Sequence, residues 1–84
     1  MEHINVAVGE ALSARMTERD ISVRRMSQIT CIASSTLFRK LRGAAGFTVP
    51  ELVRVSAPLD LDPSDVLLRA VEQVDAVAQK PGIG

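Results

Sequence analysis

A run of small hydroxyl side chains followed by positive charges lies between residues 31 and 43, in the stretch CIASSTLFRKLRG. Leu37 and Leu41 are four residues apart, so they lie on one face of a helix and can anchor it to a core. Such a helix would expose Phe38 and a set of polar groups. These are Ser34, Ser35, Thr36, Arg39, Lys40 and Arg42. Hydroxyl and guanidinium groups bind base edges and phosphates, and a helix of this size fits a DNA major groove.

The length and composition predict one small helical domain. The chain has 84 residues, and we expect the domain over residues 1–79 and a flexible tail over residues 80–84. Hydrophobic residues make up 46% of the chain and aromatic residues only 2%, so the core must be aliphatic, a mixture that favours helices.

No apolar run approaches a membrane span. Nothing resembles a signal peptide, and the single Cys31 cannot form an internal disulfide, so we expect a reducing cytoplasm.

The charges are unevenly distributed along the chain. The formal net charge is zero, which taken alone argues against nucleic acid, because phosphate neutralisation supplies most of the affinity of DNA-binding proteins. However, residues 15–42 carry seven basic and two acidic side chains, a net +5, whereas residues 1–14 carry −2 and residues 43–84 carry −3. This distribution would present one positive face to DNA. The alternative is a chance clustering of solvated helix faces.

Hydrophobic spacing predicts a first helix over residues 3–19, because apolar residues recur there about every four positions without a proline. Gly9 weakens this helix by about 1 kcal/mol relative to alanine, but so small a residue would also allow close packing against a neighbour. Ser22 is a suitable N-cap for a second helix over residues 23–30. We expect Ile29 to face inward from that helix.

The next two helices also have boundary signals. The third is expected over residues 34–42, and Gly43 follows it at a position where helix ends favour a positive φ. Thr48 and Glu51 form a capping-box pattern for a fourth helix. Pro58 should end that helix within a turn.

Asp62 and Pro63 begin the best-marked helix, with an N-cap followed by proline at the first helical position. An apolar stripe runs along this fifth helix as far as about Ala78. Its spacing of three and four residues suits a partner helix as well as an internal core. We assign four of its residues to homodimerisation, and burial against the first helix is the alternative. These four are Leu67, Ala70, Val74 and Val77.

The segments ISVRRMSQITCIASSTLFRKLRG and FTVPELVRVSAPLDLDPSDVLL resemble the lambda-repressor-like helix-turn-helix family, of the XRE or Cro and repressor type. Met26 and Ser27 match positions where that family has Leu and Ala, and Ile32 matches the apolar residue of the turn. The resemblance implies an all-α domain of five helices. The run TLFRKLRG followed by FTVPEL is similar to small actinobacterial and mycobacteriophage regulators.

The resemblance also implies that the start of the third helix reads bases, which points to Ser34, Ser35 and Arg39. Arg39 is the strongest candidate, because its guanidinium can donate two hydrogen bonds to guanine. The surrounding basic and hydroxyl groups are better placed for phosphates, which position a protein without reading sequence. These phosphate candidates are Ser22, Arg24, Arg25, Thr36, Lys40 and Arg42. The alternative for each residue is an ordinary exposed helix position.

Two positions depart from the family pattern at the turn. Cys31 stands where the family commonly has glycine, because the residue that ends the second helix often adopts a positive φ. Cysteine must therefore accept strain or a different turn. Ala33 stands where the family often has a capping serine, and we expect Ser34 to take over that cap one residue later.

The resemblance and these patterns together imply a sequence-specific DNA-binding transcriptional regulator, Cro-like or immunity-repressor-like, that occupies a palindromic operator as a dimer at the nucleoid of a bacterial host cell. The alternative is a protein-interaction module, such as an antitoxin-like or accessory protein, which the zero net charge favours. We expect no enzyme activity, cofactor or small-molecule substrate, because the sequence has no credible Ser, His and acid arrangement and no Gly-rich phosphate loop. A metal or redox role for Cys31 has little support, because no second cysteine or acidic cluster accompanies it.

Overall fold

Five α-helices and one 3-10 turn form the part of the chain described by the computed structural model, which comprises the backbone of residues 2–78 and the side chains of residues 3–75. All five predicted helices are present, with small shifts at their ends. None of the helices described here is long and apolar enough to cross a bilayer. The predicted tail, residues 80–84, lies outside the described residues. The elements are α1 (Glu2–Glu18), α2 (Val23–Thr30), α3 (Ser34–Leu41), α4 (Val49–Ser56), η1 (Ala57–Leu59) and α5 (Pro63–Ala78).

Side-chain caps begin three of the helices, as the sequence predicts. Ser22 Oγ accepts a hydrogen bond from the N–H of Arg25 at 3.0 Å. Thr48 and Glu51 form both hydrogen bonds of the capping box at the start of α4. Asp62 Oδ1 accepts a hydrogen bond of 2.8 Å from a backbone N–H at the start of α5. Each cap pairs an N–H group that the first turn of a helix cannot satisfy by itself.

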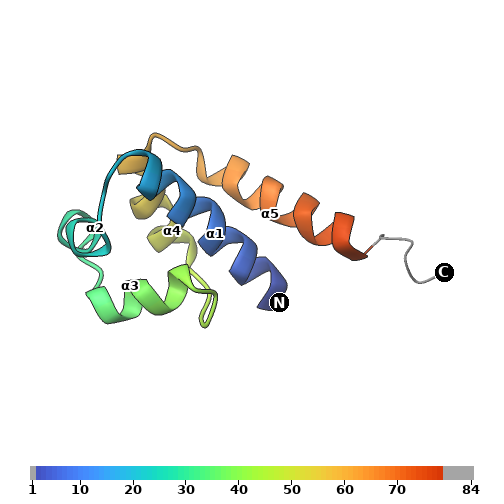
Figure 1. Cartoon of the computed structure of the whole chain (residues 1–84), viewed down its shortest axis with the longest axis horizontal. Coiled ribbons are helices and arrows are strands. Elements are labelled where there is room, and N and C mark those ends of the chain that lie inside the picture. The colour runs from blue at the N-terminus through green and yellow to red at the C-terminus, as the bar shows by residue number, and fades with distance from the viewer. Residues whose placement is uncertain (1, 79–84) are drawn as a thin grey trace.

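The other helices pack around α1. In Figure 1, α5 runs beside α1 in the opposite direction, and α2 and α3 lie together on the side away from the C-terminal end of α5. The core is aliphatic, as the composition predicts. The largest fully buried apolar side chains are Leu12, Met26, Leu37, Val55 and Leu59.

The inward face of α2 differs by one residue from the prediction. Ile29 is exposed, whereas Thr30 is buried together with Met26, four residues earlier. The hydroxyl of Thr30 donates a hydrogen bond of 2.8 Å to the carbonyl oxygen of Met26, so its burial leaves no unpaired donor. The prediction of an inward Ile29 is therefore wrong, because a threonine paired with its own helix can occupy the core position.

The stripe of α5 assigned to homodimerisation is divided between the core and the surface. Ala70 is only 2% exposed and shares the buried face of α5 with Val66, so its assignment to a dimer interface is wrong. Leu67 is exposed and Val74 is half-buried, while the side chain of Val77 lies outside the described residues. Ala70 faces inward because it follows the buried Val66 by four residues, about one helical turn.

Candidate nucleic-acid interface

The two predicted leucine anchors hold α3 against the core. Leu37 and Leu41 are buried, whereas Ser34, Ser35 and Arg39 are exposed. Full burial of a leucine side chain contributes about 1.5–3 kcal/mol, so the two leucines determine which face of α3 turns inward. Ser35 and Arg39, four residues apart, therefore share the outer side of α3, and Ser34 is exposed in its first turn.

The turn between α2 and α3 has the geometry that usually requires glycine, although Cys31 occupies it. Cys31 has a φ of 62° and a ψ of 25°, in the left-handed region. This conformation costs a residue other than glycine about 1–2 kcal/mol. Of the two outcomes that the sequence left open, the structure shows strain in the expected turn. The thiol is exposed, and no metal-binding group of three His, Cys, Asp or Glu side chains occurs in the described part of the chain.

Two hydroxyl groups support this strained turn, and neither role was predicted from the sequence. Ser27 Oγ donates a hydrogen bond to the carbonyl oxygen of Ile32, and the N–H of Ile32 donates one of 3.3 Å to Thr30 Oγ1. The N–H of Cys31 donates to the carbonyl oxygen of Ser27 at 2.9 Å. The sequence indicates only that Ser and Thr side chains tend to form hydrogen bonds with nearby backbone groups. It does not specify which backbone group each hydroxyl contacts.

Replacing Cys31 by glycine should raise the free energy of unfolding by about 1 kcal/mol, because glycine adopts a positive φ without steric strain. Urea denaturation followed by circular dichroism measures this change. Cys31→Ala is the matched control, since it removes the thiol but keeps a Cβ at the same positive φ and should not raise the free energy of unfolding in this way. A lower free energy of unfolding in Cys31→Gly would show that the cysteine side chain stabilises the turn.

The predicted transfer of the helix cap to Ser34 is wrong. Ala33 occupies the N-cap position of α3, and its methyl side chain makes no capping hydrogen bond. The carbonyl oxygen of Ala33 still accepts a hydrogen bond of 2.8 Å from the N–H of Leu37. Ser34 therefore lies within the first turn of α3, with its side chain exposed.

Lys40 connects α3 to the start of α4. Its Nζ is paired with Glu51 Oε1, which also accepts a hydrogen bond of 2.8 Å from the N–H of Thr48. The side chains of Lys40 and Glu51 are only 13% and 20% exposed. The pairing with Glu51 and the low exposure leave little of the Lys40 ammonium open to a phosphate.

The pKa of the Glu51 carboxyl is lowered, mainly by the hydrogen bond from Lys40 and to a smaller extent by the hydrogen bond from the N–H of Thr48. The folded state therefore favours the ionised carboxylate. The Glu51 carboxylate contributes to the free energy of unfolding at a pH above its unfolded-state pKa. This contribution is lost as the pH falls through its lower folded-state pKa. At neutral pH this pair supports the junction between the two helices.

Glycines allow α1 to contact the backbone at the end of α3. A methyl group on Gly9 would lie 2.1 Å from the carbonyl oxygen of Leu41, closer than these atoms can approach. Gly43 has a φ of +82°, and a methyl group there would lie 2.6 Å from Cγ2 of Val6. The close-packing role of Gly9 and the positive φ of Gly43 are thus both confirmed. These contacts set the distance between α3 and α1.

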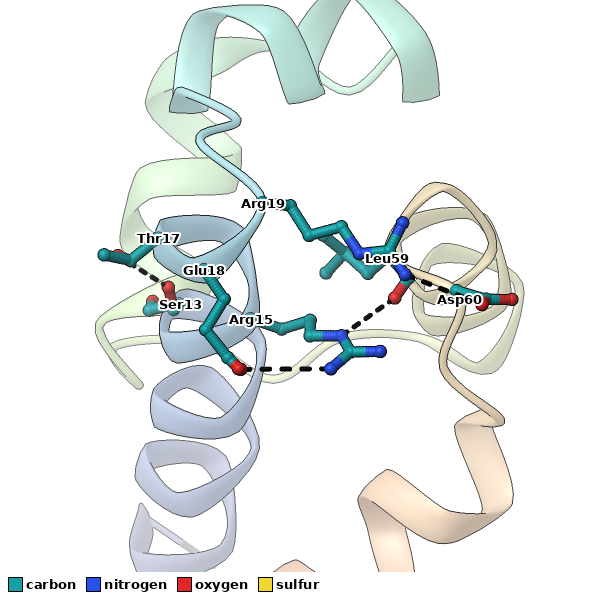
Figure 2. Close-up of polar contacts among 7 residues, drawn as sticks. All are labelled: Ser13, Arg15, Thr17, Glu18, Arg19, Leu59 and Asp60. Atoms are coloured by element: carbon teal, nitrogen blue, oxygen red, sulfur yellow. Dashed lines mark hydrogen bonds and ion pairs between the residues drawn. The ribbon is translucent and has the colours of Figure 1, made fainter.

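Two arginines of the basic segment make contacts within the molecule (Figure 2). Arg15 Nε donates a hydrogen bond of 3.1 Å to the carbonyl oxygen of Leu59, and another nitrogen of this guanidinium lies 3.9 Å from the carboxylate of Glu18. Arg19 lies 3.5 Å from the carboxylate of Asp60. Both arginines therefore tie the end of α1 to the segment around η1, away from α3.

The other basic residues of this segment lie on or next to α2 and α3, which contact each other. Arg24 and Arg25 are exposed at the start of α2, next to the capping residue Ser22. Arg42 is exposed directly after α3, and Thr36 is half-buried within it. The structure thus places five of the six phosphate candidates at or near the surface of the helix-turn-helix, while Lys40 is paired.

Two crystal structures of the clp gene regulator ClgR from Corynebacterium glutamicum are similar to this chain. One has a TM-score of 0.81 and 20% sequence identity, with 95% of this chain and 85% of that chain covered. The other has a TM-score of 0.74 and 21% identity, with coverage of 83% and 91%. No protein-family model and no curated protein matches the chain. The structural similarity confirms the predicted all-α fold, in which the described residues form five helices with a helix-turn-helix.

Proposed function

We propose that this domain is a sequence-specific DNA-binding transcriptional regulator that places α3 in the major groove of its operator. The observation that carries this proposal is the position of α3. Leu37 and Leu41 hold one side in the core, the other side exposes Ser35 and Arg39, and Ser34 is exposed in the first turn. Hydroxyl and guanidinium groups complement the acceptors on the base edges of the major groove. The fold shared with the clp gene regulator supports a regulatory role.

Phosphate contacts would orient α3 in the groove. We assign Lys40 to positioning α3 against α4. If its ammonium left Glu51 for a phosphate, one ion pair would replace another and the link between α3 and α4 would be broken. The remaining candidates surround the helix-turn-helix and would make the affinity dependent on salt. These are Ser22, Arg24, Arg25, Thr36 and Arg42.

We infer that the regulator is a Cro-like or repressor-like homodimer on a palindromic operator, with recognition helices about 34 Å apart. The outer side of α5 exposes Leu67, Leu68 and Val71, which replace Ala70 in the proposed interface beside Val74. A hollow of about 210 Å³ is lined by one of these residues, Leu67. The rest of its lining is mostly apolar and comprises Ile4, Asn5, Val8, Phe47 and Leu52. Projecting apolar side chains next to an apolar hollow suit a twofold interface, in which the same surface is used by both copies.

A protein-interaction module is the second candidate, because α4 also has exposed apolar side chains. Val49 and Val53 are exposed, and the net charge of the chain is zero. The two functions differ in their response to salt. Affinity for DNA should fall steeply as the salt concentration rises, whereas a partner held by apolar side chains should respond weakly.

Replacing Arg39 by alanine should remove about 1–3 kcal/mol of discrimination at one base pair in each half-site, because the bidentate contact with guanine is lost. Competition between an operator selected from a random pool of DNA and its single-base variants measures this discrimination. Arg69→Ala is the matched control, since it removes the same charge from an exposed position on α5. Unchanged base preference in Arg39→Ala would remove Arg39 from the reading face.

A further inference from the structure

Phe38 is an exposed aromatic residue on the candidate DNA-reading side of α3. It lies four residues after Ser34 and four before Arg42, so these side chains form one ridge beside that of Ser35 and Arg39. The residue is 50% exposed, although phenylalanine is usually buried. The core positions of α3 are already filled by its two leucines. Phe38 therefore presents an apolar surface where its neighbours are polar.

The ring of Phe38 is in contact with Arg42. The guanidinium carbon of Arg42 lies over the ring, 5.3 Å from its centre. This cation–π contact favours one orientation of the ring. A side chain that is already ordered loses less conformational entropy when it binds a ligand. The ring is thus prepared for contact with an apolar group.

We propose that Phe38 is a specificity-determining residue that contacts the 5-methyl group of a pyrimidine, thymine or 5-methylcytosine, beside the guanine read by Arg39. This inference rests on the proposed function. The thymine methyl group is the apolar feature of the base edges in the major groove, and apolar side chains recognise it. Serine specifies little, and arginine prefers guanine. Phe38 therefore distinguishes a pyrimidine with a 5-methyl group from one without it, which these polar residues do not.

The experiment uses the full chain and DNA sites that it selects from a random pool. Each thymine of the selected site is replaced in turn by deoxyuridine, which lacks only the methyl group. The wild-type protein should bind at least one such site about fourfold more weakly, the effect of one buried methyl group. Phe38→Ala should lose this difference, whereas Arg39→Ala should retain it.

A second set of sites distinguishes the two sources of the methyl group. Each cytosine of the selected site is replaced by 5-methylcytosine. About fourfold tighter binding that requires Phe38 would identify 5-methylcytosine as the preferred base. Phe38→Leu, which keeps an apolar side chain, should retain part of the effect in either set. Its circular dichroism and that of Phe38→Ala should match the wild type, because Phe38 lies outside the core.

Three outcomes would overturn the inference. In the first, the wild-type protein is insensitive to every methyl group. In the second, Phe38→Ala has the same sensitivity as the wild type. Both outcomes leave the proposed DNA-binding function intact. In the third, the protein enriches no sequence from the pool, which would overturn the proposed function together with this inference.

Discussion

Replacing Val71 by glutamate should give a folded monomer whose operator affinity is lower by about 10²–10⁴-fold. A dimer that contacts two half-sites binds DNA more tightly than a monomer by a factor of this size, because the second half-site contact forms at the effective concentration set by the first. Val71 is exposed beside Leu67 on α5, so the new carboxylate would be solvated in the monomer. In the proposed dimer it would be buried without a partner, at a large cost in free energy. Sedimentation measures the oligomeric state, and fluorescence anisotropy measures the affinity.

Gln73→Glu is the matched control for this variant. It adds the same charge at another exposed position of α5 and should preserve both the dimer and the operator affinity. Unfolding of Val71→Glu would assign Val71 to the core of the protomer. A dimer with undiminished affinity would place the interface on another surface.

Replacing Gly9 by valine should lower the free energy of unfolding by about 3 kcal/mol, because the added side chain cannot be accommodated between α1 and α3. Its Cβ would lie 2.1 Å from the carbonyl oxygen of Leu41 and 2.7 Å from the carbonyl carbon. Both are backbone atoms, so relief requires α3 to move as a whole. Urea denaturation monitored by circular dichroism measures the loss.

The control for Gly9→Val is Glu10→Val, which introduces the same side chain at the next, exposed residue of α1. Its free energy of unfolding should change by less than about 0.5 kcal/mol. If α3 is the DNA-reading helix, Gly9→Val should also weaken operator binding under conditions in which it remains folded. Equal stability of the two valine variants would contradict the close contact between α1 and α3.

The boundaries of the helices could be predicted because their determinants are local. Ser22 caps a backbone N–H three residues away, and Thr48 and Glu51 form a reciprocal pair over the same separation. Gly43 has the positive φ expected at the end of a helix. Interactions over three or four residues are set by helix geometry, which the order of residue types encodes directly.

The candidate reading face was also predictable in outline, because Leu37 and Leu41 share one side of a helix wherever it packs. The partner of Lys40 was not predictable. Glu51 is eleven residues away and belongs to another helix, so the pair depends on how the loop between α3 and α4 returns. Burial of Thr30 instead of Ile29 similarly depends on the rotation of α2 against the core.

The sequence by itself determined the helices, the side-chain caps of α2, α4 and α5, the aliphatic core and the two leucines that turn α3, since each follows from composition or from spacing within one helix. Only the tertiary structure decided that Cys31 keeps a left-handed turn, that Ala70 belongs to the core and that Lys40 is paired. It also showed that Gly9 contacts the backbone of α3. The physical reason is that these properties depend on the rotation and separation of neighbouring helices, which result from the packing of all the side chains together.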